Sequence, residues 1–274
     1  VLGAFDSANN DTISQHIAWA RNAGIDTFIS SWWGPGSRED AVFAKTLHYA
    51  TDNNIDFSWT VYFESVQARY EGNGTAIYED IKYLCDQYAS NARFLKVDGR
   101  PVIFCYAVGA DGLGAWSQAR QLLNTAGYHP FLVGDIGGIG APSPVQLAIF
   151  DGIHVYNPDG LINAGGDYNS LYQQMVFSSH QGGALACYTV SPGYDDFAVC
   201  QCGAISGRNT WFDVPRQNGD LYRQMWASAT GSRADWILIC TFNEWHEGTE
   251  IEPSVQFGSM FLDITSQYAI PWKA

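Results

Sequence analysis

The chain has 274 residues and a formal net charge of −14; 46% of its residues are hydrophobic and 15% are charged. This length is normal for one α/β barrel domain, and the apolar content is high enough for a large core. The negative charge argues against nucleic acids and anionic membranes as partners, because both require clustered Lys and Arg. No apolar run approaches the length of about 18 residues that spans a membrane, so no membrane-spanning segment is predicted.

In chain order, strand-like and helix-like segments alternate. Short apolar runs rich in β-branched and aromatic residues predict strands at 24–33, 54–64, 100–108, 129–136, 151–158, 184–193 and 235–244. These runs are almost continuously apolar, so we expect a parallel sheet that is buried on both faces. Apolar residues at helical spacing predict helices at 11–24, 37–53, 76–89, 115–127, 170–180 and 219–229.

Capping residues predict where two of these helices begin. Thr12 and Gln15 have capping-box spacing, which predicts that Thr12 caps the first helix. Ser37 precedes the second helix, whose first turn carries acidic residues that the helix dipole favours.

The alternation predicts a (β/α)8 TIM-type barrel that forms a single domain over residues 1–274. Only seven strands can be counted, and the chain begins with a loop and a helix. Either VLGAF at residues 1–5 is a stunted first strand, or the first strand lies upstream. We favour the second, because an open barrel would expose two unpaired strand edges. The expected fold is therefore a barrel whose first strand is missing or truncated at the N-terminus.

Cysteines and sequons bear on cofactors and location. Cys105, Cys187 and Cys240 lie inside predicted strands and should be buried thiols. The C-x-C spacing of Cys200 and Cys202 is not that of a zinc finger, and we expect no metal and no organic cofactor. N-glycosylation triplets begin at Asn10 and Asn73 and favour a secreted, cell-surface or secretory-pathway location.

The ends of the predicted strands carry the side chains with chemical function. In a barrel of this kind the active site lies where strands end and the following loops begin. Carboxyl, aromatic and amide groups dominate there, with almost no Lys or Arg, which suits a neutral polyol and argues against a phosphorylated substrate. The candidates for substrate contact are Trp32, Trp33, Glu64, Tyr106, Tyr156, Asn243, Trp245 and His246.

Glu244 and Glu247 are the candidate catalytic residues. They lie in CTFNEWHEGTEIEPS at the end of the last predicted strand, where a turn can direct both carboxyl groups into one cleft. Two carboxyl groups about 5–9 Å apart cleave glycosidic bonds: one protonates the leaving oxygen, and the other acts as base or nucleophile. Their environments must differ so that one stays protonated near neutrality. From the motif alone, a solvated acidic loop stays open as the alternative.

Six segments between residues 24 and 254 follow one another in the chain: GIDTFISSWWG, VYFE, RPVIFCY, SPGYDD, RQNGDLYRQMW and FNEWHEGTEIEPS. They belong to a resemblance that extends from about residue 2 to about residue 257. Together they resemble the endo-α-1,2-mannosidases and mannanases of glycoside hydrolase family 99. The resemblance implies a (β/α)8 barrel of retaining glycosidases that act within α-mannosyl chains. The implied partner is an oligosaccharide or polysaccharide, either α-mannan or an N-glycan.

The same resemblance implies residue roles. Glu244 would be the base that takes a proton from the 2-hydroxyl of the sugar, which then forms a 1,2-anhydro sugar. Glu247 would be the acid that protonates the leaving oxygen. Glu64 would bind substrate hydroxyls, and Trp33 and Tyr156 would line the sugar subsites. Glu250 departs from the family pattern, in which Gln is common.

Two alternatives to a hydrolase stay open from the sequence. One is a catalytically inactive carbohydrate-binding or structural surface glycoprotein of the same barrel ancestry, and the other is a carbohydrate-transfer enzyme. The retained pair of Glu244 and Glu247 favours the hydrolase.

Overall fold

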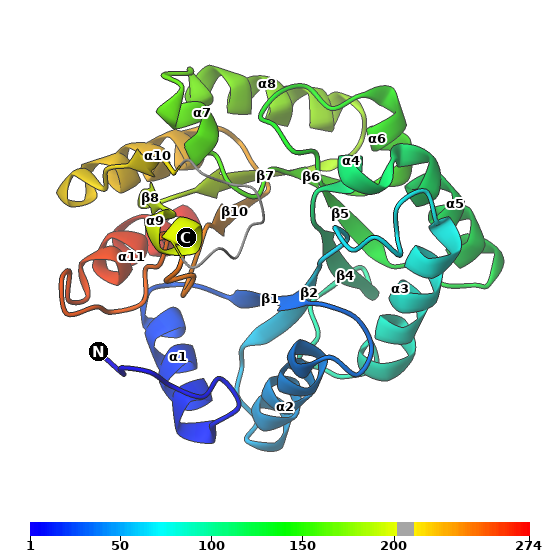
Figure 1. The fold of residues 1–274 in the computed structure, drawn as a ribbon, viewed down its shortest axis with the longest axis horizontal. Helices are drawn as coiled ribbons and strands as arrows, with labels where there is room; N and C mark the ends of the chain where they lie inside the picture. The colour runs from blue at the N-terminus through cyan, green and yellow to red at the C-terminus, as the bar shows by residue number, and fades with distance from the viewer. Residues whose placement is uncertain (202–210) are drawn as a thin grey trace.

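The computed structural model describes residues 1–201 and 211–274, and it shows parallel strands surrounded by helices (Figure 1). The strands pair in the order β1-β2-β4-β5-β6-β7-β10, and each neighbouring pair is parallel. Their bounds are β1 Thr27–Trp32, β2 Ser58–Phe63, β4 Arg100–Cys105, β5 Phe131–Asp135, β6 Gly152–His154, β7 Leu185–Val190 and β10 Trp236–Ile239. A short strand, β3 (Lys96–Val97), pairs antiparallel with β4. The predicted strands and the barrel-type wall that they form are confirmed.

Helices cover the outside of this wall (Figure 1). The predicted helices are present as α1 Asn10–Asn22, α2 Arg38–Asp52, α3 Gly74–Tyr88, α5 Leu113–Thr125, α8 Tyr168–Gln181 and α10 Asp220–Gly231. The structure adds α4 Val108–Asp111, α6 Pro144–Ile149, α7 Asp159–Asn163, α9 Phe197–Gln201, α11 Met260–Trp272 and the 3-10 turn η1 Gln217–Gly219. No helix in the described part of the chain is both long and apolar enough to cross a membrane.

The capping residues predicted from sequence have mixed outcomes. Ser37 caps α2, since its side chain accepts a hydrogen bond of 3.0 Å from the amide of Asp40. The prediction that Thr12 caps the first helix is wrong, because α1 begins at Asn10 and Thr12 lies inside its first turn. Asn9 is the cap, and its Oδ1 accepts from the amides of Asp11 at 2.7 Å and Thr12 at 3.4 Å.

The core has two parts. The larger part lies between strands and helices, and a smaller cluster with a separate set of side chains contains Tyr62, Val102, Phe104, Phe131, Val133 and Cys187. Cys105, Cys187 and Cys240 are buried, as predicted. Side chains rather than open space fill a barrel of this size, so a substrate must bind at one of its ends.

The wall has a seam between β1 and β10. In the described ranges no strand pairs with both of them, and the VLGAF segment at residues 1–5 forms no strand. Aromatic side chains meet across this seam: the rings of Phe28 and Phe242 lie 4.7 Å apart, and His16 contacts Phe242 at 5.3 Å. Among the described residues, side chains make the contact across this seam.

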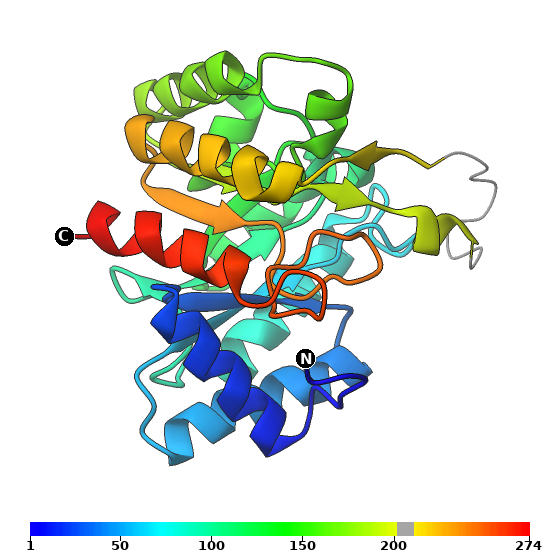
Figure 2. The same cartoon turned by 90° about the vertical axis from the view of Figure 1, so that its left-hand side faces the viewer.

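An arm projects from the end of the barrel at which the strands finish (Figure 2). We define the arm as residues 194–201 and 211–216; it contains β8 (Tyr194–Asp195), α9 and β9 (Asp213–Val214). The strands β8 and β9 pair antiparallel. Cys202, whose spacing from Cys200 was considered above, lies outside the described residues.

Candidate active site

Glu64 follows β2 at the carboxyl end of the barrel and is only 9% exposed. Its Oε1 accepts a hydrogen bond of 2.7 Å from the Oγ of Ser31 on the neighbouring strand β1. Ser31 Oγ in turn accepts from Nε1 of Trp33 at 2.9 Å, and the Trp33 side chain is 44% exposed. A chain of hydrogen bonds therefore connects an exposed indole to a buried carboxyl group.

The surroundings of Glu64 make its carboxyl group hard to ionise. Burial raises the pKa of Glu64 to about 7; the hydrogen bond from Ser31 lowers it in part, and the charges of Glu247 and Glu244 raise it further. Coulomb interactions fall off with distance, so their effect indicates that the three carboxyl groups share one region.

Glu247 and Glu244 lie in the turn after β10 and are both half-buried. Burial, and then the charge of Glu244, raise the pKa of Glu247 to about 7, while a hydrogen bond from Tyr156 lowers it. That bond runs from the Tyr156 hydroxyl to Glu247 Oε2 at 3.4 Å. The amide of Glu244 donates to Thr241 Oγ1 at 3.0 Å, which fixes the start of the turn. Glu247 is therefore a carboxyl group that keeps its proton close to neutral pH.

Three tyrosine rings pack together beside these carboxyl groups. Tyr62 is the second-last residue of β2, while Tyr106 follows β4 and Tyr156 follows β6. Their ring centroids lie 5.5–5.6 Å apart. His154 lies against Tyr62 at 5.5 Å, and burial lowers its pKa to about 4. The imidazole is therefore neutral at physiological pH and belongs to the core.

Asp135 organises the loops around this cluster. It is buried at the end of β5, and its carboxylate accepts from the amides of Ala107 at 3.1 Å, Gly137 at 2.9 Å and Tyr156 at 3.3 Å. One side chain thus holds the loops that follow β4, β5 and β6.

The structure places Trp32 in the core rather than in the site. It is fully buried, and its Nε1 donates to Asp40 Oδ1 at 2.9 Å. Side chains alternate along a strand, so Ser31 and Trp33 share one side while Trp32 faces the helices. Sequence reasoning included Trp32 and missed Ser31, although this alternation could have separated them.

The remaining candidates are more exposed. Asn243, Trp245 and His246 are exposed, and Trp245 Nε1 donates to Glu252 Oε2 at 2.9 Å. Trp245 and His246 line a cleft of about 1090 Å³, together with the arm, residues 254–257 and the N-terminal residues. Its described lining residues include neither Glu244 nor Glu247. Trp245 and His246 therefore face a space beside the group of three carboxyl residues, Glu64, Glu244 and Glu247.

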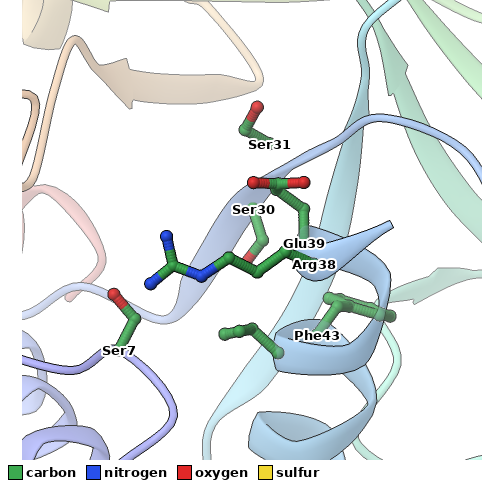
Figure 3. A pocket seen from close by; sticks show the side chains of 7 residues that line it. Ser7, Ser30, Ser31, Arg38, Glu39 and Phe43 are labelled. Carbon is green, nitrogen blue, oxygen red and sulfur yellow. The ribbon is translucent and has the colours of Figure 1, made fainter. Parts of the chain in front are cut away.

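A smaller pocket of about 140 Å³ adjoins Ser31 (Figure 3). Ser7, Ser30, Arg38 and Glu39 contribute its polar lining, so both signs of charge are present. Figure 3 shows the Arg38 side chain extending above Ser7. Because Ser31 lines this pocket and also binds Glu64, the pocket is adjacent to the candidate site.

The two sequon asparagines are both exposed. Asn10 is the first residue of α1. Asn73 caps α3, where its Oδ1 accepts from the amide of Ala76 at 3.1 Å.

Comparison with known proteins places this chain in a family. The profile of glycosyl hydrolase family 99 matches residues 1–264, so the chain belongs to that family. It is 24% identical over 268 residues to a glycoprotein endo-alpha-1,2-mannosidase of Mus musculus, covering 93% of this chain and 56% of the relative. It is 26% identical to a glycoprotein endo-alpha-1,2-mannosidase-like protein of Danio rerio, covering 96% and 61%. The chain thus spans little more than half the length of these curated relatives.

Solved structures confirm the fold. The GH99 endo-alpha-mannosidase from Bacteroides thetaiotaomicron superimposes with a TM-score of 0.82 at 23% identity, covering 99% of this chain and 82% of that one. A glycoside hydrolase-like protein gives a TM-score of 0.69 at 18% identity, covering 98% and 88%.

Proposed function

We propose that this chain is a retaining, endo-acting glycoside hydrolase that cleaves internal α-1,2-mannosidic linkages, with Glu244 as base and Glu247 as acid. The observation that carries the proposal is the half-buried Glu247, whose pKa of about 7 leaves it protonated beside a second carboxyl group at the end of β10. General acid catalysis needs a group of this kind. Family membership and the named mannosidase relatives support the choice of α-mannosides.

In the first proposed step Glu244 accepts the proton of the 2-hydroxyl of the sugar whose glycosidic bond breaks. The freed oxygen attacks C1 of the same ring, and Glu247 gives its proton to the departing oxygen. In an α-mannoside the 2-oxygen and the leaving group lie on opposite faces of the ring, so this attack displaces the leaving group from behind. The product of this step is a 1,2-anhydro sugar.

In the second step Glu247, now ionised, removes a proton from water as the water attacks C1. The C1–O2 bond breaks, and the 2-oxygen takes back the proton from Glu244. Two inversions at C1 give net retention, and both carboxyl groups return to their starting states.

The surrounding side chains suit a neutral sugar chain. Trp33 offers an exposed ring face beside Glu64, and no ion pair in the described part of the chain involves Glu64, Glu244 or Glu247. We propose that Trp33, Tyr106 and Tyr156 contact sugar rings while Glu64 binds hydroxyl groups. Asn243, Trp245 and His246 would contact sugar units next to this cluster. The substrate is then a chain of an α-mannan or an N-glycan.

Glu244→Gln and Glu247→Gln test the proposal on an oligosaccharide with an internal α-1,2-mannosidic bond. Each variant should lose about 100-fold or more of the rate, the usual range for removing a general acid or base. Glu79→Gln, at an exposed position of α3, is the matched control and should keep the parent rate. Parent-like cleavage by both site variants would refute the assignment.

The product identity separates the alternatives. A retaining hydrolase releases the α-anomer first, which proton NMR detects before mutarotation. Binding of the oligosaccharide in titration calorimetry without any product would favour the carbohydrate-binding protein. A new glycosidic bond to an added sugar acceptor would favour the transfer enzyme.

We also propose a secreted, cell-surface or secretory-pathway location, supported by the exposure of Asn10 and Asn73. Expression in a host that glycosylates secreted proteins should give a product that shrinks on peptide N-glycosidase treatment. Replacing both asparagines by Gln should abolish the shift.

A further inference from the structure

The backbone of the turn that carries Glu247 is held by the arm. The amide of Asp195 in β8 donates to the carbonyl oxygen of Glu247 at 2.8 Å. Gly248 follows with a φ of +60°, and a Cβ there would lie 3.1 Å from the backbone nitrogen and oxygen of Asp195. Only glycine fits this close approach without strain.

Arg216, just after β9, makes a second and larger contact with the same turn. Its Nη2 donates to the carbonyl oxygen of Gly248, and its Nη1 donates to that of Glu250, both at 2.8 Å. Nη2 also lies 2.8 Å from Glu250 Oε2 in an ion pair whose side chains are 12% and 8% exposed. The planar guanidinium group thus bridges Gly248 and Glu250, which both follow Glu247 in the same turn.

The guanidinium group is itself fixed in place. Its central carbon lies 5.0 Å from the ring centroid of Phe257 and 4.6 Å from that of Phe261. The ion pair balances its charge, so the arginine can act on Glu247 through position more than through charge. The guanidinium group has several N–H donors and can bind both carbonyl oxygens at once, which suits a residue that holds the turn in place. The compact ammonium group of a lysine cannot span both carbonyl groups.

We propose that Arg216 is a positioning residue for Glu247: it fixes the turn at Gly248 and Glu250 so that the Glu247 carboxyl group points at the leaving oxygen. This inference rests on the acid role of Glu247 proposed above. Small displacements of a reacting group cost up to about 100-fold in rate, so loss of this bridge should be visible in kinetics.

The test compares two substrates that differ in their need for an acid. One is the α-1,2-linked manno-oligosaccharide, whose leaving group is a sugar hydroxyl. The other is the matching glycosyl fluoride, whose leaving group needs little protonation. In Arg216→Gln we expect kcat/KM to fall roughly 10–100-fold on the oligosaccharide and to stay within about 3-fold on the fluoride. Arg216→Lys should show the same pattern with a smaller loss.

Controls separate this inference from the proposed function. Glu247→Gln should show the same dependence on leaving group; its absence, or the absence of cleavage by the parent, would overturn the proposed function and the inference with it. Suppose that Glu247→Gln shows the expected dependence on leaving group. If Arg216→Gln then loses kcat/KM equally on both substrates, or on neither, only the positioning role of Arg216 is overturned. Arg223→Gln, at an exposed ion pair of α10, should keep parent rates. Thermal unfolding checks each variant, and Arg216→Lys carries the test if the Gln variant does not fold.

Discussion

The hydroxyl of Ser31 donates to Oε1 of Glu64 across 2.7 Å, joining the ends of two neighbouring strands. This one bond does not compensate the carboxyl group for its burial, because the pKa of Glu64 still rises to about 7. Ionising Glu64 in the folded protein therefore costs free energy, which the rest of the fold offsets.

Glu64→Gln should stabilise the protein at alkaline pH. An unfolded Glu ionises near pH 4.3, and the folded one near pH 7, so the parent loses stability as the pH rises between these values. Gln does not ionise, and its carbonyl oxygen can still accept from Ser31. We expect the variant to gain about 1–3 kcal/mol at pH 8 and little at pH 4, measured by urea unfolding. Equal stability of parent and variant at pH 8 would contradict this.

The parent rate should fall as the pH rises above about 7. Glu247 must carry a proton to act as the acid, and its pKa is about 7. The descending limb of kcat/KM against pH should therefore have its midpoint near this value. A kcat/KM that stays constant from pH 7 to pH 9 would exclude Glu247 as the acid.

Tyr156→Phe should move that descending limb to higher pH. The Tyr156 hydroxyl stabilises the ionised form of Glu247 and lowers its pKa, so removing it raises the pKa. We also expect a rate loss of a few-fold to about 10-fold at pH 6, since the carboxyl group loses one anchor. A shift of the limb to lower pH would show that the bond has the opposite effect.

Trp33→Ala should weaken substrate binding without unfolding the protein. The side chain is 44% exposed, so little core packing is lost. We expect KM to rise by roughly 10-fold, which corresponds to about 1.4 kcal/mol of ring contact. Phe177→Ala, at an exposed position on α8, is the control and should leave KM unchanged. A KM equal to that of the parent in Trp33→Ala would show that this ring does not contact the substrate.

Asp40→Asn should destabilise the fold. Burial raises the pKa of Asp40, but hydrogen bonds from Trp32, Tyr88, Gly36 and Tyr83 outweigh it and lower the pKa overall. We expect a loss of about 2–4 kcal/mol in the free energy of unfolding, because Asn cannot accept all these bonds. The contribution of Asp40 is present above its unfolded pKa of about 3.9 and is lost as the pH falls through its lower folded value. Asp52→Asn, exposed on the same helix, should be neutral.

Periodicity was sufficient to predict the wall of the barrel, because parallel strands buried on both faces leave apolar runs that sequence alone reveals. It did not reveal α11, a helix of 13 residues that carries Pro271 near its end. It was also less informative about short elements. The arm was missed because β8 and β9 have two residues each, too few to show alternation.

The candidate site was predictable in part. Glu64, Tyr156 and Glu247 follow three separate strands, and the rule that strand ends converge was enough to bring them together. The partners of these residues were not predictable, since Ser31 and Arg216 act through contacts between segments far apart in sequence. Such contacts depend on the direction of each side chain and on the path of the arm. The spacing of residue types within one segment predicts neither.

The seam between β1 and β10 runs beside the candidate active site. Trp33 follows β1, and Glu244 and Glu247 follow β10, so the two rims of the candidate site belong to strands that no backbone ladder joins within residues 1–201 and 211–274. The rings of Phe28 and Phe242 meet edge to face across this boundary, with their planes at 63°. The candidate site thus borders a boundary at which, among the described residues, aromatic side chains rather than a backbone ladder make the contact.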